Sequence, residues 1–438
     1  MELAITFEGR HLATLVAAND EVRLSYSVAW QAAPDHFPIS LRMPVDGSTY
    51  KGDIVLLWLM NLLPEGDPLR AMTRVVGATA DDVLGLIART GTDLAGALSI
   101  GLDTPGGTPD YREITGSDAL ERIISDLPAR PFLVDEEGVS MSLAGAQDKL
   151  PVAKLGDAIG VPMHGAPSTH ILKPDNPRLL GSVQNEALCM VLARRAGLLT
   201  APVTTGLAGQ RSYLLVTRYD REGEPGAVRR IHQEDFCQSL GRPPVAKYEY
   251  NGTGTRGPSI ADFFATVRAH MTAREITQLL DAVIFNIAIG NVDSHAKNYS
   301  VLLTHQANRF APLYDLMSGL GWANITQNHA QAIGGQRRGR HIYARHWQRM
   351  AEASGLSPKA TVRRVEAVTA RLLRELPRAS EEVAAMPAGP GLMLKVFERE
   401  IAQRIGEVRA HAQEPGDEEY GAPGNDDADQ IDATTYHG

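Results

Sequence analysis

The stretch Asn291–Asn298, Asn-Val-Asp-Ser-His-Ala-Lys-Asn, constrains the fold of this chain more than any other. It places Asp293 five residues before Asn298, after a segment, Glu275–Ile289, whose apolar residues recur at helical spacing and which stops at Gly290. In protein kinases an aspartate and an asparagine at this spacing accept the proton of the substrate hydroxyl and bind magnesium, respectively. Because such pairs also occur by chance in long chains, the neighbouring residues must show whether Asp293 and Asn298 form a site of this kind.

A β-hairpin is predicted directly after this stretch. Its strands are Tyr299–Leu303 and Arg309–Tyr314, although Pro312 makes the second strand more typical of a sheet edge. A turn between Gln306 and Ala307 would place opposite each other those residues whose numbers sum to 613.

In that register Asn298 lies opposite Asp315, at the open end of the hairpin and next to Asp293. Carboxylate and amide oxygens that converge in this way suit Mg²⁺ carrying phosphate. The residues leave a second interpretation equally open, in which both aspartates only cap the ends of strands.

The composition indicates a globular protein of more than one domain. The chain has 438 residues, 43% of them apolar, and no stretch approaches the roughly 20 apolar residues that span a membrane. Its first residues, Met1–Ile5, lack a basic region and a long apolar run, which argues against a signal peptide. Cys189 and Cys237 lie in helical patterns without metal-ligand spacing, so we expect buried, reduced thiols and a cytoplasmic protein.

The net charge of −9 comes almost entirely from the C-terminus. Residues 414–438 hold eight acidic residues and no Lys or Arg, so the rest of the chain carries a charge near −1. We expect a disordered acidic tail over residues 413–438. Because the remainder is not strongly basic, direct binding to nucleic acid is not the first expectation.

Local patterns predict three regions before this tail. Residues 1–105 form a β-rich subdomain, with an antiparallel meander over 1–30, helices over 54–63 and 81–89, and a linker at 103–110. Residues 130–230 form a mixed lobe, and residues 231–412 form a mostly helical lobe that contains the hairpin. Helices of the last lobe are predicted over 232–240, 260–270, 275–289, 344–355, 358–376 and 392–412.

The mixed lobe holds two candidate phosphate contacts. Ala144, Gly145 and Ala146 form a small-residue turn between predicted strands, where backbone N–H groups can approach phosphate oxygens closely. Lys173 ends an apolar strand, as the phosphate-contacting lysine of kinases does. Taken singly, each feature is more often an ordinary turn and an ordinary edge lysine.

A helix is predicted over Ser182–Gly197, with Glu186 in its first turn. Glu186 either complements the helix dipole or pairs with Lys173. The following buried strand, Tyr213–Tyr219, would lead in a two-lobed kinase into the hinge, whose backbone binds adenine.

Two further segments carry weaker signals. Residues 252–257 match Gly-x-Gly-x-x-Gly, but no buried strand precedes them, so we expect an ordinary loop. The arginine-rich residues 334–345 are either a solvated basic loop or a grip for phosphates or an acidic partner.

Together these motifs resemble those of the HipA family of bacterial toxin Ser/Thr kinases. The matching segments run in order from about residue 60 to 315: Asn61-Leu-Leu-Pro-Glu-Gly66, Ala95-Gly-Ala-Leu-Ser99, Ser142–Lys149, His170–Lys173, Asn185-Glu186, Thr217–Arg221, His232–Gln238, Lys247-Tyr-Glu249, Asp293–Asn298 and Tyr314-Asp315. The resemblance implies an α/β, two-lobed protein-kinase-like fold, with a small β-rich N-terminal subdomain, a mixed N-lobe and a mostly α-helical C-lobe.

The resemblance also implies roles for individual residues. Asp293 would be the catalytic base, and Asn298 and Asp315 would bind Mg²⁺. Ser142 would be autophosphorylated, and the added charge would oppose the phosphates of ATP and expel the loop that carries it. The residues implied to contact ATP are Ala144, Gly145, Ala146, Gln147, Asp148 and Lys149 of the phosphate loop, Lys173, the hinge residues Thr217, Arg218 and Tyr219, and His295, Ala296, Lys297, Asn298, Tyr314 and Asp315.

The partners implied by the resemblance are a HipB-like helix-turn-helix antitoxin, operator DNA contacted mainly through the antitoxin complex, and a protein substrate such as an aminoacyl-tRNA synthetase. Asp293 lacks a preceding His-Arg and Asp315 lacks a following Phe-Gly, which excludes ordinary eukaryotic-type protein kinases. Two alternatives stay open, namely a small-molecule or lipid kinase of related fold and a catalytically silent corepressor.

Overall fold

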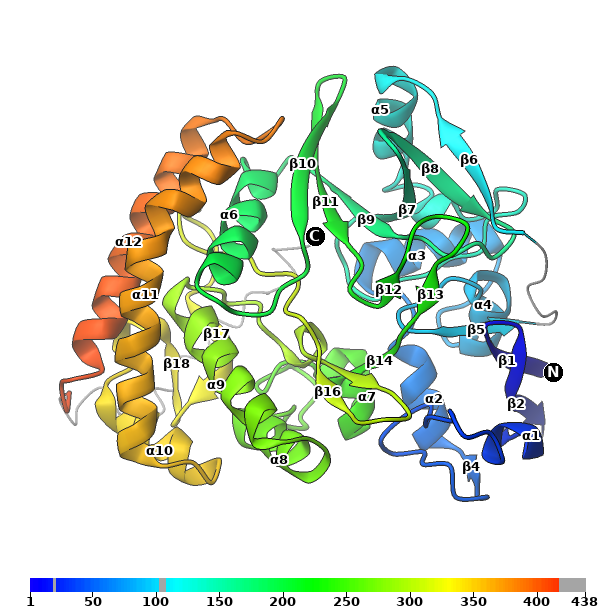
Figure 1. Cartoon of the computed structure of the whole chain (residues 1–438), viewed down its shortest axis with the longest axis horizontal. Coiled ribbons are helices and arrows are strands. Elements are labelled where there is room, and N and C mark those ends of the chain that lie inside the picture. Colours follow the sequence, from blue (N-terminus) through cyan, green and yellow to red (C-terminus); the bar gives the residue numbers. More distant parts are fainter. Residues whose placement is uncertain (19–20, 102–107, 417–438) are drawn as a thin grey trace.

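A computed structural model describes residues 1–18, 21–101 and 108–416 of the chain. The described residues form two halves that lie side by side (Figure 1). The half that carries the N-terminus is built around two β-sheets, and the other half is mostly helical and ends in two long antiparallel helices.

The N-terminal subdomain is an antiparallel sheet in the order β4-β3-β2-β1-β5. Its strands are β1 (Glu2–Phe7), β2 (Arg10–Ala18), β3 (Glu21–Tyr26), β4 (Thr49–Lys51) and β5 (Leu98–Gly101), and its helices are α1 (Val28–Gln31), α2 (Asp53–Met60), α3 (Gly66–Val76) and α4 (Val83–Thr90). The predicted meander and the two predicted helices are confirmed. The sequence analysis missed α3, whose Pro68 lies in the first turn, where a missing N–H costs little.

The second sheet has the order β10-β11-β9-β7-β8-β6. Its strands are β6 (Asp110–Ile114), β7 (Leu150–Leu155), β8 (Ala158–Met163), β9 (His170–Pro174), β10 (Val203–Ala208) and β11 (Arg211–Thr217). Near it lie α5 (Ser117–Asp126), a 3-10 turn η1 (Pro131–Leu133) and a short pair, β12 (Arg221–Glu222) and β13 (Arg229–Arg230). Helix α6 (Ser182–Arg195) packs between this sheet and the helical half, as the sequence predicts for a buried helix.

The helical half contains α7 (Phe236–Leu240), α8 (Ile260–His270), α9 (Ala273–Ala288), α10 (Ala344–Ala353), α11 (Pro358–Ala384) and α12 (Leu392–His411). It also contains a small sheet of β14 (His232–Asp235), β15 (Ser300–Leu303) and β16 (Arg309–Phe310), the pair β17 (Asn328–Ile333) and β18 (Gln336–Arg338), and the 3-10 turns η2 (Pro244–Ala246), η3 (Ala296–Asn298) and η4 (Gly339–His341). One apolar core joins α6, α8, α9, α11 and α12, which fixes the stretch after α9 on a rigid base.

The helix predicted over 232–240 is wrong in its first half. His232–Asp235 form β14, which pairs with β15, because His232 and Glu234 are buried between the N-terminal subdomain and the helical half. The helix begins only at Phe236. Asp235 caps it by accepting a hydrogen bond from the N–H of Gln238, so the polar residue starts the helix and does not lie within it.

The predicted register of the hairpin is also wrong. Val301 pairs with Phe310 and Leu302 with Arg309, so the numbers of paired residues sum to 611 and not 613. The hydroxyl of Thr304 bonds both the N–H and the carbonyl of Ala307, which closes the turn earlier. Asn298 and Asp315 are therefore not opposite each other in the ladder, and the second strand ends at Phe310, two residues before Pro312.

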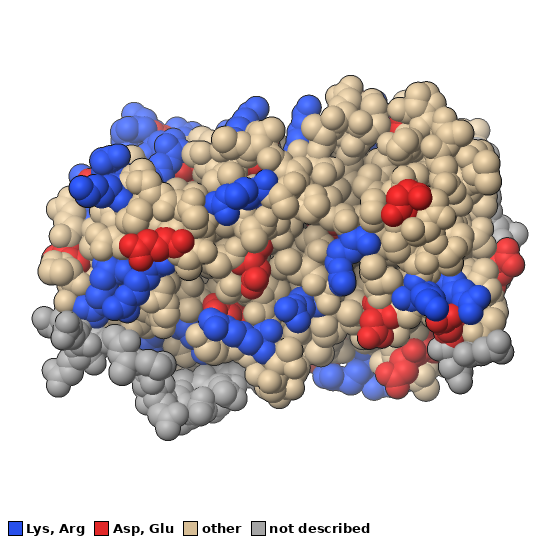
Figure 2. Space-filling view, turned by 90° about the horizontal axis from the view of Figure 1, so that it is seen from below, with Lys and Arg blue, Asp and Glu red and all other residues tan. Residues whose placement is uncertain are grey.

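Several other expectations have outcomes in the described residues. Cys189 and Cys237 are buried free thiols, and residues 252–257 form a loop, as predicted. None of the described helices combines the length and apolar composition of a membrane span. On the face drawn in Figure 2, acidic and basic side chains of the described residues are interspersed. Residues 417–438 of the disordered tail predicted over 413–438, and residues 103–107 of the linker predicted at 103–110, lie outside the described part. Within the described residues, Glu414 accepts a hydrogen bond from the N–H of Ala344.

Candidate active site

A cavity lies where the second sheet, the helical half and the N-terminal subdomain meet. Its wall contains fourteen of the predicted site residues: Ala144, Gly145, Ala146, Gln147, Lys149, Lys173, Thr217, Arg218, Tyr219, His295, Lys297, Asn298, Tyr314 and Asp315. Asp148, Ala296, Asp293 and Ser142 do not line it. Residues of the 144–149 loop and of the 295–298 turn thus line one cavity, although they lie about 150 residues apart in the sequence.

Lys173, on β9, is the electrostatic centre of the cavity. Its Nζ lies 2.7 Å from Glu186 Oε1 of α6 and 2.6 Å from Asp315 Oδ1. Burial by itself lowers the pKa of Lys173, but the charges of Asp315 and Glu186 outweigh burial and raise it. The ion pair with Glu186 is therefore confirmed. Glu186 lies in the second turn of the helix, not the first, where it reaches the lysine.

Asp315 follows the hairpin with a φ of +56°, in the left-handed region that non-glycine residues seldom adopt. Its carboxylate is one-fifth exposed and faces both Lys173 and the cavity. Backbone conformations of this kind cost about 1–3 kcal/mol and persist where surrounding contacts hold them. The contact with Lys173 is one such contact, so this strained position is tied to the cavity.

Asp293 and Asn298 are held by the turn after α9. The Nδ2 of Asn298 donates to the carbonyl of Asp293 at 2.8 Å, and the N–H of Asp293 donates to Asn291 Oδ1 at 3.1 Å. The hydroxyl of Tyr248 donates to Asp293 Oδ1. Asp293 is buried next to the cavity wall, with the neutral ring of His295 against Tyr248. Burial, followed by the charge of Lys247, lowers the pKa of His295 to about 3.

The turn at 144–146 lines the cavity. Gly145 has a φ of +107°, and a Cβ there would lie 2.6 Å from the Nζ of Lys149, so this position requires glycine. Lys149 Nζ donates to the carbonyl of Ala144 at 2.7 Å. Burial, followed by the charge of Lys173, lowers the pKa of Lys149 to about 8. A cation held this loosely by the protein suits an anionic ligand.

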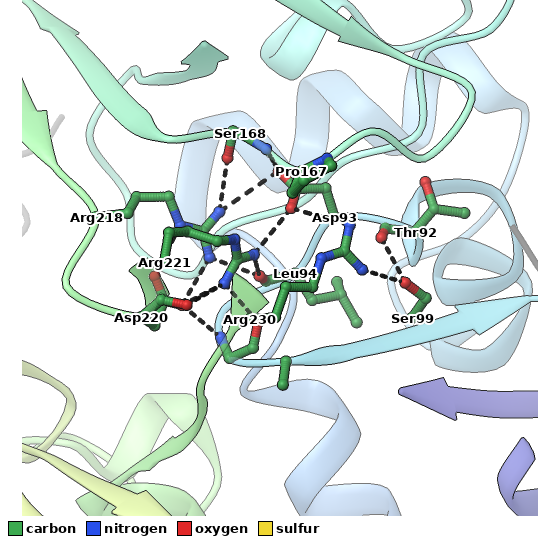
Figure 3. A network of polar contacts seen from close by, with 12 residues as sticks. Thr92, Asp93, Leu94, Ser99, Pro167, Ser168, Arg218, Asp220, Arg221 and Arg230 are labelled. Atoms are coloured by element: carbon green, nitrogen blue, oxygen red, sulfur yellow. Dashed lines mark hydrogen bonds and ion pairs between the residues drawn. The ribbon is translucent and has the colours of Figure 1, made fainter. Parts of the chain in front are cut away.

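Of the three predicted hinge residues, Thr217, Arg218 and Tyr219, Arg218 has a side chain that is engaged within the protein. The backbone N–H groups of Thr217 and Arg218 already donate to Pro202 and Thr169. The Arg218 guanidinium turns away into a buried network, where it bonds Asp220 in bidentate fashion and the carbonyl of Leu94 (Figure 3). Its side chain therefore anchors the segment Thr217–Tyr219 through Asp220 and Leu94.

Figure 3 shows that this network joins Arg218, Asp220 and Arg221 to Asp93 and Leu94 of the N-terminal subdomain. Asp93 lies 2.9 Å from Arg221 and 3.5 Å from Arg218, and Arg230 Nη1 donates to Ser99. Burial raises the pKa of Asp93, but the three neighbouring arginines lower it overall. The segment that holds Arg218 and Arg221 is thus fixed by a charge from a different subdomain.

Lys297 also proves to have partners within the protein. Its Nζ lies 2.6 Å from Asp235 Oδ2 and 2.8 Å from Asn61 Oδ1, and it is buried. It lines the cavity, yet its ammonium group holds the stretch Asn291–Asn298 to Asp235, the N-cap of α7, and to Asn61 of the N-terminal subdomain.

The sequence assigned no role to several polar residues around the cavity, among them Asn61, Glu65, Lys247 and Tyr248. Asn61, Glu65 and Lys247 line the cavity, and Tyr248 contacts Asp293. These residues belong to two of the matching motifs, Asn61–Gly66 and Lys247-Tyr-Glu249. The number of residues between these motifs and Asn291–Asn298 does not show that they lie close together in space.

The donor set of the cavity fits a nucleotide with a divalent cation. Gln147 Oε1, Glu65 Oε1 and His295 Nδ1 are buried without a hydrogen-bond partner among the described residues. Asn298 and Asp315 offer hard oxygen atoms, and Lys149 and Lys173 offer positive charge. The described residues contain no cluster of three or more His, Cys, Asp or Glu suited to a metal, so a cation here would need oxygen atoms from its ligand.

Comparison with known proteins identifies the family. The family described as HipA N-terminal domain matches residues 3–101, and the family described as HipA-like C-terminal domain matches residues 141–376. A Sinorhizobium fredii protein, Y4mE, whose name describes it as a candidate kinase, is 36% identical over 79% of this chain and 83% of its own length. The serine/threonine-protein kinase toxin HipA of Shewanella oneidensis is 31% identical over 84% of this chain and 86% of its own length.

The same relationship is visible in three dimensions. A chain from the Shewanella oneidensis complex of HipA, HipB and operator DNA superposes with a TM-score of 0.81 at 26% identity, over 93% of this chain and 99% of that chain. The predicted mixed α/β fold of HipA type is confirmed. The chain described here therefore belongs to the HipA family.

Proposed function

We propose that this protein is a Ser/Thr protein kinase that uses ATP and Mg²⁺ and acts as the toxin of a toxin–antitoxin pair. The observation that carries the proposal is the meeting of Lys173, Glu186 and Asp315 in one ion-paired group, on a cavity lined by Asn298, which in turn bonds the buried Asp293. The named Ser/Thr kinase toxin among the relatives supports it.

Each residue then has a defined task. Asp293, oriented by Tyr248, accepts the proton of the substrate hydroxyl. Lys173, oriented by Glu186, contacts ATP phosphates, and the 144–149 loop with Lys149 covers them. Asn298 and Asp315 would hold Mg²⁺, which, when bound, neutralises charge on the phosphates. The protein contributes position and electrostatics, which are the main sources of catalysis in phosphoryl transfer.

The segment Thr217–Tyr219 would form the nucleotide-base side of the cavity. Its position is fixed by the Arg218–Asp220 pair and by the backbone bonds to Pro202 and Thr169. The base contacts would therefore come from the backbone and from Tyr219, because the Arg218 side chain is engaged elsewhere.

Ser142 would be the site of self-phosphorylation. Its side chain is fully buried, and its Oγ donates to the carbonyl of Leu62 at 3.1 Å. The loop must therefore open before a phosphate can reach this hydroxyl, and the phosphorylated residue has no room to return. We expect phosphorylation to leave the loop expelled and the kinase silent.

The proposed partners follow from the relatives. A HipB-like antitoxin and operator DNA are partners of the Shewanella oneidensis HipA in its solved complex. We propose the same assembly here, with DNA contacted mainly through the antitoxin. A component of translation such as an aminoacyl-tRNA synthetase is the proposed protein substrate.

The experiment is intact-mass spectrometry of phosphatase-treated protein after incubation with Mg²⁺ and ATP, beside an Asp293→Asn sample. A gain of one phosphate in the wild type alone, mapped to Ser142, is the expected result. Transfer to sugars or lipid headgroups but not to protein would show a small-molecule or lipid kinase. No transfer to any acceptor, with repression retained, would show a catalytically silent corepressor.

A further inference from the structure

The loop Asn61–Gly66, between α2 and α3, brings the N-terminal subdomain to the cavity. Asn61 and Glu65 line the same wall as Lys173 and Asp315. Asn61 is 2% exposed, and Glu65 is largely buried with an Oε1 that has no partner among the described residues. Buried polar groups need a reason to be there, because leaving them unpaired costs free energy.

The first contact of this loop is with the catalytic stretch. Lys297 Nζ donates to Asn61 Oδ1 at 2.8 Å and to the Asn61 carbonyl at 3.1 Å. Asn61 itself is fixed, because its Nδ2 donates to the carbonyls of Leu57 and Arg242 at 2.8 Å each. Lys297 directly precedes Asn298 in the turn η3, so a held Lys297 also fixes where Asn298 points.

The second contact is with the phosphate loop. The N–H of Glu65 donates to the carbonyl of Gly145 at 3.1 Å, and Leu62 accepts from Ser142 Oγ. On the other side of the loop, the N–H of Ser142 donates to the carbonyl of Asp93 at 3.2 Å. Two segments of the N-terminal subdomain therefore hold the phosphate loop between them.

The third contact is with the segment that orients Asp293. Glu65 Oε2 lies 2.8 Å from Lys247 Nζ, and both side chains are mostly buried, at 15% and 11% exposure. Lys247 precedes Tyr248, whose hydroxyl donates to Asp293. One loop of six residues thus contacts each of the three parts that phosphoryl transfer would need.

We propose that the Asn61–Gly66 loop is a positioning element of the catalytic site, with Asn61 acting through Lys297 and Glu65 acting through Lys247 and Gly145. The inference rests on the proposed kinase function and extends it. The N-terminal subdomain is then part of the catalytic unit and not an appended module. A signal that reaches this subdomain has a direct route to catalysis.

The test compares Asn61→Ala, Glu65→Ala and Glu65→Gln with a matched control, Glu21→Gln, which alters a partly exposed carboxylate of the same subdomain, far from the cavity lining. Hydrogen–deuterium exchange of the free full-length proteins is measured first. We expect faster exchange over 293–299 in Asn61→Ala and over 246–249 in Glu65→Ala, whose lost side chain pairs with Lys247, with helices α9 and α11 unchanged. Unchanged exchange in both segments would overturn the proposal, whatever the activity.

The rate of phosphate incorporation is measured next, on samples whose thermal unfolding shows them folded. Asn61→Ala should lower the maximal rate about tenfold or more, the effect of losing a hydrogen bond to a charged group, and change the KM for ATP much less. Glu65→Gln should retain more activity than Glu65→Ala, because glutamine keeps an oxygen for Lys247. Rates equal to wild type in all three variants would show a structural role only. If wild type incorporates no phosphate while exchange changes as expected, the kinase proposal fails and the positioning role stands.

Discussion

Two buried groups of charged side chains in this protein differ in how far the protein itself provides them with partners. In the network of Figure 3, the side chains of Asp93, Arg218, Asp220 and Arg221 are at most 3% exposed, and each has several partners in the protein. In the cavity, Lys149 has a single backbone partner and Asp315 is one-fifth exposed. The network holds the hinge to the N-terminal subdomain, whereas the cavity keeps its charges available.

The pKa directions record the same contrast. Arginine charges outweigh burial and lower the pKa of Asp93 and Asp220, so these carboxylates stay ionised. Burial dominates at Lys149 and lowers its pKa, because the protein leaves that cation short of negative charge. A charge that the fold satisfies contributes to stability, whereas a charge that the fold leaves unsatisfied is available to a ligand. Substitutions in the two groups should therefore change stability in opposite directions.

The largest expected effect is in the network. Asp93→Asn leaves Arg218, Arg221 and Arg230 buried with one carboxylate among them, so the free energy of unfolding should fall by about 3–5 kcal/mol. Chemical denaturation measures it. The control is Asp35→Asn, which breaks an exposed ion pair with Arg10 and should cost less than about 1 kcal/mol. A loss at Asp93 no greater than that of the control would remove the distinction drawn here.

Lys149→Met should not lower the free energy of unfolding, in contrast to Asp93→Asn. Removing a cation that the protein scarcely compensates should leave the free protein as stable as the wild type or more so. Affinity for Mg²⁺ and ATP should fall about 10- to 100-fold, because one charged hydrogen bond to phosphate is lost. Calorimetric titration and thermal unfolding of the same samples provide both values. A marked loss of stability with intact affinity would place Lys149 among the structural charges.

Tyr248→Phe separates orientation from binding. The variant keeps the ring against His295 but loses the hydroxyl that donates to Asp293. We expect the rate of phosphate incorporation to fall about tenfold while the KM for ATP is unchanged, because only the position of the carboxylate is disturbed. Equal changes in rate and KM would instead indicate a general collapse of the cavity.

The fold could be predicted where one segment carries its own signal. Helix α8 was predicted with its observed ends, and Ser259 caps it in the way such residues do. The segment 232–235 was mistaken for helix because its pairing partner, β15, lies about 65 residues further along the chain. Non-local pairing of this kind leaves no periodicity that a local reading can detect.

In the candidate site too, residues within local motifs could be predicted, whereas contacts between distant segments could not. Asp293, Asn298 and Lys173 stand in motifs with chemical meaning, so sequence spacing was enough to select them. The register that was meant to join Asn298 to Asp315 was wrong by two residues, yet both residues line the cavity, since Asp315 is placed by Lys173. Arg218 was assigned to the nucleotide because the sequence could not show that its side chain bonds Asp220 and Leu94 and lies near Asp93.

The sharpest test of the contrast is a dependence on pH. Lys149 titrates near pH 8 in the free folded protein, against an ordinary value of 10.5. Only the protonated ammonium donates to phosphate with full charge, so above pH 8 binding must take up a proton. Affinity for Mg²⁺ and ATP should then weaken by up to about tenfold per pH unit above 8.

Stability should move the other way over the same range. Between pH 8 and 10.5 the unfolded chain keeps the Lys149 proton and the folded protein has lost it, so the unfolded state binds more protons. The free energy of unfolding must therefore rise with pH, relative to Lys149→Met, which has no such group. Titration of both proteins from pH 7 to 9.5 and denaturation up to pH 10.5 measure the two trends. If affinity and the free energy of unfolding depend on pH in the same way in wild type and variant, the protein itself compensates the charge of Lys149. The charges of the cavity would then be satisfied within the protein, like those of the network.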